Sequence, residues 1–264
     1  MATIKINIMI RVLSLLAFLL FSIFVTAQVS ENRSIPEFTK IRVRSGVELT
    51  FTQDAYNTIK VEADDTVKLT DVVTKVIGNT LEIYVESKNY SNNNRKNKKK
   101  LNHKILRVAV SSPLVDEFKA GSSSKIILKN GVTSKKIILD ISSSGTLIGN
   151  IKADELTIDL SSSGTIESNI ATAKLEARLS SSSEAILSGN ADSAEIKTSS
   201  SATFNGKKVT SKTAKIESSS SSSVSLIVTA NLDAKASSSA SIDYYGNPQK
   251  VEVEKSSSGS VSKK

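Results

Sequence analysis

The chain has 264 residues, a formal net charge of +9 and a hydrophobic content of 39%, with 5% aromatic residues and no Cys. This hydrophobic content is sufficient for a buried core, which argues against wholesale disorder despite the many serines. The absence of Cys excludes disulfides and a lipid anchor on a Cys. Because there is also no Trp, the core must consist mainly of Ile, Val, Leu and Ala.

The first segment, residues 1–27, has the composition of a secretory signal peptide. Lys5 and Arg11 form a basic start, and an apolar run follows from Val12 to Val25. The run is shorter than the ~20 residues that a membrane-spanning helix needs, and "VTA" places small residues where a signal peptidase cleaves. We expect cleavage before Gln28, no transmembrane span in the mature chain, and a location in the periplasm, on the cell surface or outside the cell. The alternative is an uncleaved membrane anchor.

Residues 28–110 contain several stretches in which apolar and polar residues alternate, as in strands with one buried face. One stretch, Glu37–Gln53, predicts two strands around Ser45-Gly46. Further strands are predicted within Thr58–Asp64, Val72–Glu86 and Lys104–Ser112. We expect this N-terminal β region to form either the first, less regular rungs of the fold that follows or a β cap joined to it.

A basic segment, Asn92–Lys104, interrupts this region with the sequence "NNNRKNKKKLNHK". The simpler interpretation is a solvated loop between two strands. The alternative is a patch for an anionic partner, with Lys98, Lys99 and Lys100 as candidate ligand-binding residues. Because the segment has no aromatic residue for base stacking, and because export is predicted, we expect no nucleic-acid partner.

Residues 111–264 repeat a serine triplet that is followed by a small residue and then an apolar one. The triplets align with starts at positions 122, 142, 161, 180, 199, 219, 237 and 256. The start at 219 is a choice, because the six serines of Ser218–Ser223 allow several registers. A nearly constant period indicates a repeat architecture and argues against a flexible linker.

Apolar and polar residues alternate before each triplet, as at Leu156, Ile158 and Leu160, and β-branched residues are frequent. We therefore predict an all-β fold, a β-solenoid similar to a right-handed parallel β-helix. Its ~19-residue rungs would hold two or three short strands each and would stack about 4.8 Å apart. The dipeptides Gly149-Asn150, Gly189-Asn190 and Asn205-Gly206 suit the corners between strands.

If strand alternation continues through a triplet, its outer serines face solvent and its middle serine points into the solenoid. The predicted inward file is Ser143, Ser162, Ser181, Ser200, Ser220, Ser238 and Ser257. Each inward hydroxyl would need a partner, either a serine one rung away or a backbone carbonyl. The small residue after each triplet would allow a tight turn.

The order of several motifs resembles a known family. "F-x-x-I-x-V-x-S-G-V-x-L-x-F-x-Q" (Phe38–Gln53) is followed by "L-x-V-x-V-x-S-P" (Leu106–Pro113), then by "F-K-A-G-S-S-S", repeated S-S-S-G units and "Y-Y-G-N-P". This order is similar to that of the putative auto-transporter adhesin, head GIN domain family, whose members commonly show G-S-G where this chain has S-S-S. The resemblance implies an exported β-solenoid-like protein that interacts at surfaces, and it implies no catalytic residues.

The sequence offers little for catalysis. Solenoid lyases and glycosidases need paired carboxylates, or carboxylates with Ca²⁺, on one face, whereas Asp140, Asp159, Glu176 and Glu195 are typical of a solvated face. The single His, His103, argues against a metal site or a Ser-His-Asp triad. We therefore expect no enzymatic activity, no cofactor and no metal.

Two classes of function remain. The first is an adhesin-like or cell-envelope binding module for glycan, lipopolysaccharide or a surface protein, and the second is a structural envelope protein without a small ligand. Sugar sites often use aromatic residues, for which Tyr84, Tyr90, Tyr244 and Tyr245 are available; the last two are candidate ligand-binding residues. A polysaccharide-acting enzyme is a lesser alternative.

Overall fold

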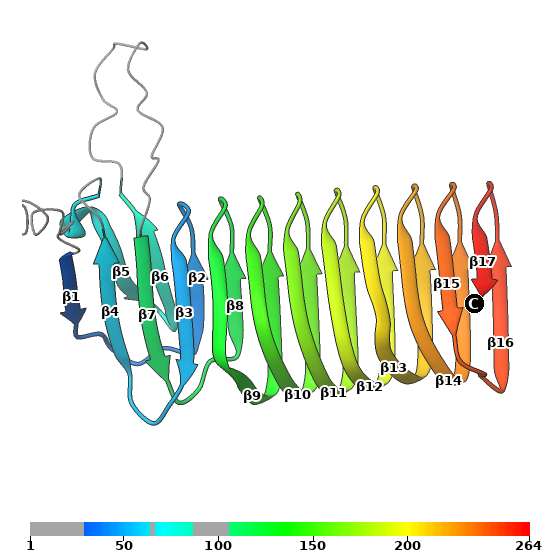
Figure 1. Cartoon of the computed structure of the whole chain (residues 1–264), viewed down its shortest axis with the longest axis horizontal. Helices are drawn as coiled ribbons and strands as arrows, with labels where there is room; N and C mark the ends of the chain where they lie inside the picture. The colour runs from blue at the N-terminus through cyan, green and yellow to red at the C-terminus, as the bar shows by residue number, and fades with distance from the viewer. Residues whose placement is uncertain (1–28, 64–66, 87–105) are drawn as a thin grey trace, which may run out of the picture.

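A computed structural model of the chain describes residues 29–63, 67–86 and 106–264. The predicted signal peptide and the basic segment with Lys98, Lys99 and Lys100 lie outside the described residues. The described chain is nearly all β, with 17 strands and a turn of 3-10 helix, η2 (Leu69–Asp71). The strands form a solenoid of about 8 turns, so the predicted fold class is confirmed (Figure 1).

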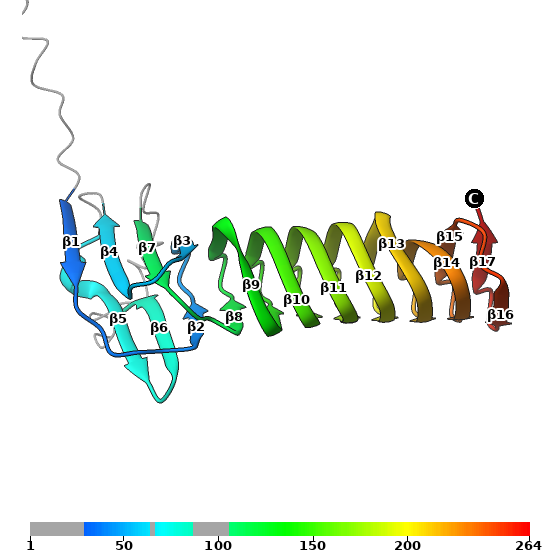
Figure 2. The same cartoon turned by 90° about the horizontal axis from the view of Figure 1, so that it is seen from below.

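The serine-rich part consists of strands that stack in parallel along one axis (Figure 2). They are β8 (Glu117–Ala120), β9 (Lys125–Ile141), β10 (Thr146–Leu160), β11 (Thr165–Leu179), β12 (Glu184–Thr198), β13 (Thr203–Ser218), β14 (Ser223–Ala236), β15 (Ser241–Tyr245), β16 (Lys250–Lys255) and β17 (Ser260–Lys263). Thr165 lies opposite Thr146 on one side and Glu184 on the other. Equivalent residues of these neighbouring rungs therefore lie 19 positions apart, as the triplet spacing predicted.

Each complete rung is one long, bent strand followed by one tight turn, not two or three short strands separated by corners. Gly149, at φ 144°, and Gly189, at φ 110°, lie inside β10 and β12, where they allow the strand to bend. Asn205-Gly206 likewise lies within β13. The predicted corners are therefore bends within one strand. The ladder to the next rung continues through Gly149-Asn150, with Asn150 opposite Asn169, whereas after Gly206 it shifts register.

The core lies between the two faces of the rungs and is filled by columns of apolar side chains. One column contains Ile126, Leu147, Ile166, Ala185, Phe204, Val224 and Ile242, each 0 or 1% exposed. Burying one such Val, Leu, Ile or Phe stabilises the fold by about 1.5–3 kcal/mol. Because each side chain packs against those of adjacent rungs, the rungs stabilise one another.

The N-terminal region combines the two arrangements that its sequence left open. Its strands are β1 (Val29–Arg33), β2 (Lys40–Val43), β3 (Glu48–Gln53), β4 (Thr58–Ala63), β5 (Val72–Ile77), β6 (Thr80–Val85) and β7 (Leu106–Ser112). β2 and β3 pair in parallel with β8 and β9, and β6 and β7 stack in parallel beyond them. β4, β1 and β5 then add antiparallel strands, which cover the parallel edge at this end.

The serine triplets form tight turns, and the predicted inward file of middle serines is wrong. In one turn, Ser162 and Ser163 have φ values of 49° and 60°, and the Gly164 amide donates to the Ser161 carbonyl at 2.9 Å. Two successive residues with positive φ are typical of a type I′ turn. Strand alternation stops where the chain reverses, so the middle serine lies at the apex. Ser143, Ser162, Ser181, Ser200, Ser220, Ser238 and Ser257 are all exposed.

The residue after the triplet is the one that points inward. The two left-handed residues are serines, so Gly164 is not needed for the turn conformation. It is small because a Cβ there would lie 2.3 Å from the Ile141 carbonyl oxygen of the preceding rung. At the equivalent position of another rung, Ser183 is 1% exposed and donates its hydroxyl hydrogen bond to the Leu160 carbonyl at 3.2 Å. The expected inward serine thus occurs two positions later than predicted.

The turn geometry also defines the register of the repeat. Ser220 and Ser221 have positive φ, which agrees with a triplet start at 219. In the first triplet, Ser122 and Ser123 are the left-handed residues, so that turn begins at Gly121, one residue before the predicted start.

Candidate functional site: a groove along the turn edge

The tight turns stack into one regular edge of the solenoid, which we call the turn edge (Figure 1). Each turn has two successive residues with positive φ: Ser45-Gly46, Ser122-Ser123, Ser143-Ser144, Ser162-Ser163, Ser181-Ser182, Ser200-Ser201, Ser220-Ser221, Ser238-Ser239 and Ser257-Ser258. Hydrogen bonds link successive turns: the Ser144 amide donates to the Ser162 carbonyl and the Ser163 amide to the Ser181 carbonyl, both at 3.0 Å. The turn backbone therefore forms a ladder of its own and holds the exposed hydroxyls at a regular spacing.

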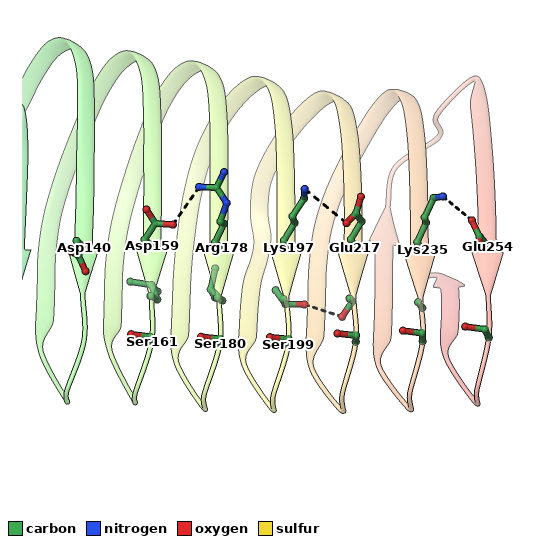
Figure 3. Close-up of a pocket in the computed structure, with 18 residues that line it drawn as sticks. Asp140, Asp159, Ser161, Arg178, Ser180, Lys197, Ser199, Glu217, Lys235 and Glu254 are labelled. Atoms are coloured by element: carbon green, nitrogen blue, oxygen red, sulfur yellow. Dashed lines mark hydrogen bonds and ion pairs between the residues drawn. The ribbon is translucent and has the colours of Figure 1, made fainter.

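A groove of ≈ 670 Å³ runs beside this edge across the rungs (Figure 3). One wall, the charge column, contains Asp140, Asp159, Arg178, Lys197, Glu217, Lys235 and Glu254. The other wall, the serine column, contains the first residue of successive turns: Ser161, Ser180, Ser199, Ser219, Ser237 and Ser256. Figure 3 shows the hydroxyls of Ser161, Ser180 and Ser199 pointing the same way.

Strand alternation explains why the two columns face each other. In β10, Asp159 and Ser161 lie outward on either side of Leu160, which is 2% exposed and points into the core. Two residues of strand separate the columns by roughly 6.6 Å, and neighbouring rungs by about 4.8 Å. The groove therefore repeats one charged group and one hydroxyl in each rung.

Two rungs place polar residues beneath the groove where the others place Leu or Ala. Thr198 and Ser218 are buried, and their hydroxyl oxygens lie 2.9 Å apart. Ser222 lies 2.9 Å from Thr198 and 2.8 Å from Ser218, and its hydroxyl donates to the Ser219 carbonyl at 2.7 Å. This cluster satisfies its own hydroxyls and so belongs to the core.

The charges of the column pair with one another between rungs. Arg178 lies 3.5 Å from Asp159, Lys197 lies 3.9 Å from Glu217, and Lys235 binds Glu254 at 2.8 Å. The hydrogen bond with Lys235 lowers the pKa of Glu254, and the same bond raises the pKa of Lys235. Both groups are therefore charged at neutral pH. The column as a whole holds four acidic and three basic residues, so it mixes the two signs with little net excess of either.

Ion pairs between charged side chains also occur in the first rungs. Glu117 binds Lys40 at 2.7 Å and Lys119 at 2.9 Å, and Lys119 also binds Asp140 at 3.2 Å. Burial raises the pKa of Glu117, but the hydrogen bonds from Lys40 and Lys119 outweigh it, so that the net pKa lies below its ordinary value. The Glu117 carboxylate thus joins neighbouring rungs as an ion.

The serine column differs from the charge column because its hydroxyls have no hydrogen bond to any described residue. The hydroxyls of Ser161, Ser180 and Ser199 are half-buried at the groove wall. Each can donate one hydrogen bond and accept two. The column is therefore the part of the groove whose hydrogen-bonding capacity is not used within the described protein, and the paired charges beside it can accept or donate further bonds.

The candidate ligand-binding tyrosines lie outside the groove. Tyr244 is half-buried against the core, and Tyr245 follows it on the same strand and so points to the opposite face. Neither residue lines the groove. Tyr84 is instead engaged by cations, with the Arg44 guanidinium 4.7 Å and the Lys75 ammonium 5.9 Å from its ring centre.

The sequence pointed to part of the groove. The first serine of each triplet was predicted to face solvent, and Ser161 does so. The sequence predicts a solvated face at Asp140 and Asp159, and in the structure they also belong to a column with paired cations. The missed signal was the position two residues before each triplet, which carries a charge in rung after rung.

Among the described residues, no group of three or more His, Cys, Asp or Glu side chains could hold a metal ion. Within the same ranges, no helix has the length and apolar character needed to cross a membrane. The groove offers hydroxyl groups and paired charges for hydrogen bonding.

The family model described as "Putative auto-transporter adhesin, head GIN domain" matches residues 37–248. The chain belongs to this family. The resemblance inferred from the motifs is therefore confirmed. The matched residues extend from the loop before β2 to the loop before β16, so they include the groove except for the last rung.

Solved structures of similar proteins share the fold. A putative lipid binding protein from Parabacteroides distasonis ATCC 8503 is 23% identical, with a TM-score of 0.79, and the match covers 91% of this chain and 98% of that one. A putative adhesin from the same organism is 16% identical, with a TM-score of 0.81 and coverages of 91% and 98%. A putative adhesin from Parabacteroides merdae ATCC 43184 is also 16% identical, with a TM-score of 0.80 and coverages of 91% and 97%. No curated protein matches the chain.

Proposed function

We propose that the chain is an exported, non-catalytic binding module of the adhesin type, and that the groove along the turn edge is its binding surface. The observation that carries this proposal is the serine column, whose regularly spaced hydroxyls have no hydrogen bond to the described protein. The family description, which names an adhesin, supports the same class of function.

The groove favours an extended, hydroxyl-rich ligand such as a glycan chain or the sugar part of lipopolysaccharide. A ligand that lies along the solenoid axis would meet an equivalent serine and an equivalent charged residue about every 4.8 Å. Weak contacts repeated along one chain add to a useful affinity because the second and later contacts are intramolecular. The charge column contains both signs, as in Arg178, Glu217 and Lys235, which suits a ligand without a large net charge.

The name of one similar structure raises lipid as another ligand. In this chain the solenoid interior is filled by side chains such as Ile166 and Phe204, both 0% exposed, so an acyl chain would have to bind on the outside. The groove walls are serines and ions, which are poor partners for hydrocarbon. We therefore favour the glycan.

A structural rod without a small ligand is the second candidate. It is favoured by the ion pairs between rungs, such as Lys235–Glu254 at 2.8 Å, and by the hydrogen-bonded turns, because both features have a role in stacking alone. The two candidates differ in whether the serine hydroxyls have a partner outside the protein.

The test is binding of the purified protein to a panel of glycans, lipopolysaccharides and matrix proteins, at low and at physiological salt. For any hit, Ser180, Ser199 and Ser219 are replaced together by Ala. A hydrogen bond between uncharged groups contributes about 0.5–1.5 kcal/mol, so the loss of three predicts an affinity at least tenfold lower.

The matched control replaces three half-buried serines that do not line the groove: Ser134, Ser225 and Ser241. It should bind as the unchanged protein does. An equal effect of both triple variants would reject the groove as the site, and absence of any salt-resistant hit would favour the structural rod.

A further inference from the structure

A second hollow lies away from the turn edge, on the outer face of β10, β11, β12 and β13. Its volume is ≈ 490 Å³, within the range of small-molecule sites. It is lined by Ile148, Gly149, Asn150, Glu167, Ser168, Asn169, Ile186, Leu187, Ser188, Asn205, Lys207 and Lys208. None of these residues lines the groove of the turn edge, so the two sites can be tested separately.

The hollow lies between two irregular rungs. On one side, the pairing of β9 with β10 shifts because β9 has extra residues between Leu128 and Val132. On the other side, the pairing of β12 with β13 shifts between Ile186 and Ser188 because β13 carries an extra residue there. In repeat proteins, insertions of this kind often mark the binding face, and β-bulges re-aim side chains next to sites.

The β13 irregularity presents two lysines to the hollow. Lys207 and Lys208 are exposed, and neither has an ion pair or hydrogen bond with another described residue. This distinguishes them from Lys197 and Lys235 of the charge column, each of which binds a carboxylate. An anion that binds Lys207 and Lys208 therefore breaks no ion pair within the described protein.

The remaining lining adds amides and apolar surface. Asn150 and Asn205 have no hydrogen bond to another described residue, and Asn169 donates from its amide nitrogen to the Ser188 hydroxyl at 3.0 Å. Ile186 is 38% exposed and offers a small apolar surface beside these amides. Amides suit hydroxyl groups because each can donate and accept.

These features together match a sugar unit that carries a carboxylate. We propose that this hollow binds a uronate unit of an acidic polysaccharide, with the carboxylate held by Lys207 and Lys208. The amides of Asn150 and Asn205 bind the ring hydroxyls, and Ile186 contacts a C–H face of the ring. Glu167 is the one carboxylate in the lining, so two cations face one anion, and the hollow has a net positive charge that suits a single carboxylate.

The probe is an oligogalacturonate, compared with the same oligosaccharide after its carboxylates have been reduced to alcohols. Binding to the purified full chain is measured at physiological salt. We expect the acidic chain to bind and the reduced chain to bind at least tenfold more weakly, because hydrogen bonds to charged groups are the stronger ones.

Two variants assign the binding to the hollow. Lys207→Gln with Lys208→Gln should weaken oligogalacturonate binding at least tenfold. The matched control, Lys135→Gln with Lys136→Gln, removes the same charge from two adjacent exposed lysines that do not line the hollow, and it should change binding less than twofold. Asn169→Asp introduces a like charge at nearly constant shape and should also weaken binding.

The proposal is overturned if oligogalacturonate does not bind at physiological salt. It is also overturned if the two double-lysine variants lose affinity equally, because an equal loss indicates a nonspecific charge effect. Equal binding of the acidic and reduced chains would overturn it as well. Triple replacement of the serine column should leave oligogalacturonate binding unchanged, so failure of the groove proposal and failure of this one are distinguishable.

Discussion

The left-handed serines of the turn edge predict that a single Ser→Gly change should stabilise the protein at one position of a turn and destabilise it at another. Ser163 has a φ of 60° and is exposed at the apex. Its side chain has no hydrogen bond to another described residue, so its removal costs no contact. Its backbone amide bond to the Ser181 carbonyl, at 3.0 Å, is kept by Gly.

The magnitude follows from two opposing effects. An L-residue in the left-handed region costs about 1–2 kcal/mol, which Gly at position 163 would recover. Gly also has a larger conformational freedom in the unfolded chain, which costs about 0.5–1 kcal/mol. The net expectation for Ser163→Gly is a free energy of unfolding higher by about 0.75 kcal/mol, the midpoint of a range of about 0–1.5 kcal/mol.

The matched control is Ser161→Gly in the same turn. Ser161 has no positive φ, so Gly there recovers no strain and pays only the entropic cost, about 0.5–1 kcal/mol. The two variants, two residues apart in the same exposed turn, are thus expected to change stability in opposite directions.

The assay is thermal and urea unfolding followed by circular dichroism. A change of 1 kcal/mol shifts the midpoint of a protein of this size by roughly 2–4 °C. A triple variant, with Gly for Ser144, Ser182 and Ser221, uses turns at least two rungs apart, roughly 10 Å, where effects nearly add. Its expected gain is about 1.5–3 kcal/mol. If Ser163→Gly is as destabilising as Ser161→Gly, the left-handed assignment of the turn is wrong.

Three further predictions follow from burial and charge. Ser162→Leu should change stability by less than about 1 kcal/mol because the side chain is exposed, whereas Ser183→Leu should cost about 1–3 kcal/mol by overpacking an inner position; equal midpoints in urea unfolding would reject this contrast. Gly189→Ala should be strongly destabilising, because a Cβ there would lie 2.0 Å from the Ile170 carbonyl oxygen, while Gly78→Ala has open space and should cost only the strain of its positive φ; thermal midpoints compare the two. The pKa of Glu117 is lowered in the folded protein, so its carboxylate stabilises the fold at pH values above the ordinary pKa of 4.5, and this stabilisation is lost as the pH falls below 4.5. Glu117→Gln should therefore flatten the pH dependence of stability between pH 5 and 3, measured by urea unfolding.

The fold could be predicted because its two determinants are local patterns. Alternation such as Leu156, Ile158 and Leu160 indicates strand, and a constant triplet spacing indicates that the strands stack in register. The turn conformation could not be predicted in the same way. Ser has no preference for positive φ, and the pattern that normally signals a type I′ turn is Asn-Gly or Asp-Gly. The sequence therefore predicts that strand alternation continues through Ser162, whereas in the structure the chain reverses there.

The groove and the second hollow depend on register to different degrees. Asp159 and Arg178 are 19 positions apart, so their pairing follows from the repeat once the positions before each triplet are aligned. The lysines of the hollow depend on an irregularity instead. The extra residue in β13 was visible only as a triplet gap of 20 between 199 and 219, and that gap does not say where along the rung the chain bulges. The structure places the bulge beside the hollow, because Ile186 pairs with Asn205 whereas Ser188 pairs with Lys208. Regular positions therefore build the rod and its groove, and the departures from the repeat are where a ligand-specific site is to be sought.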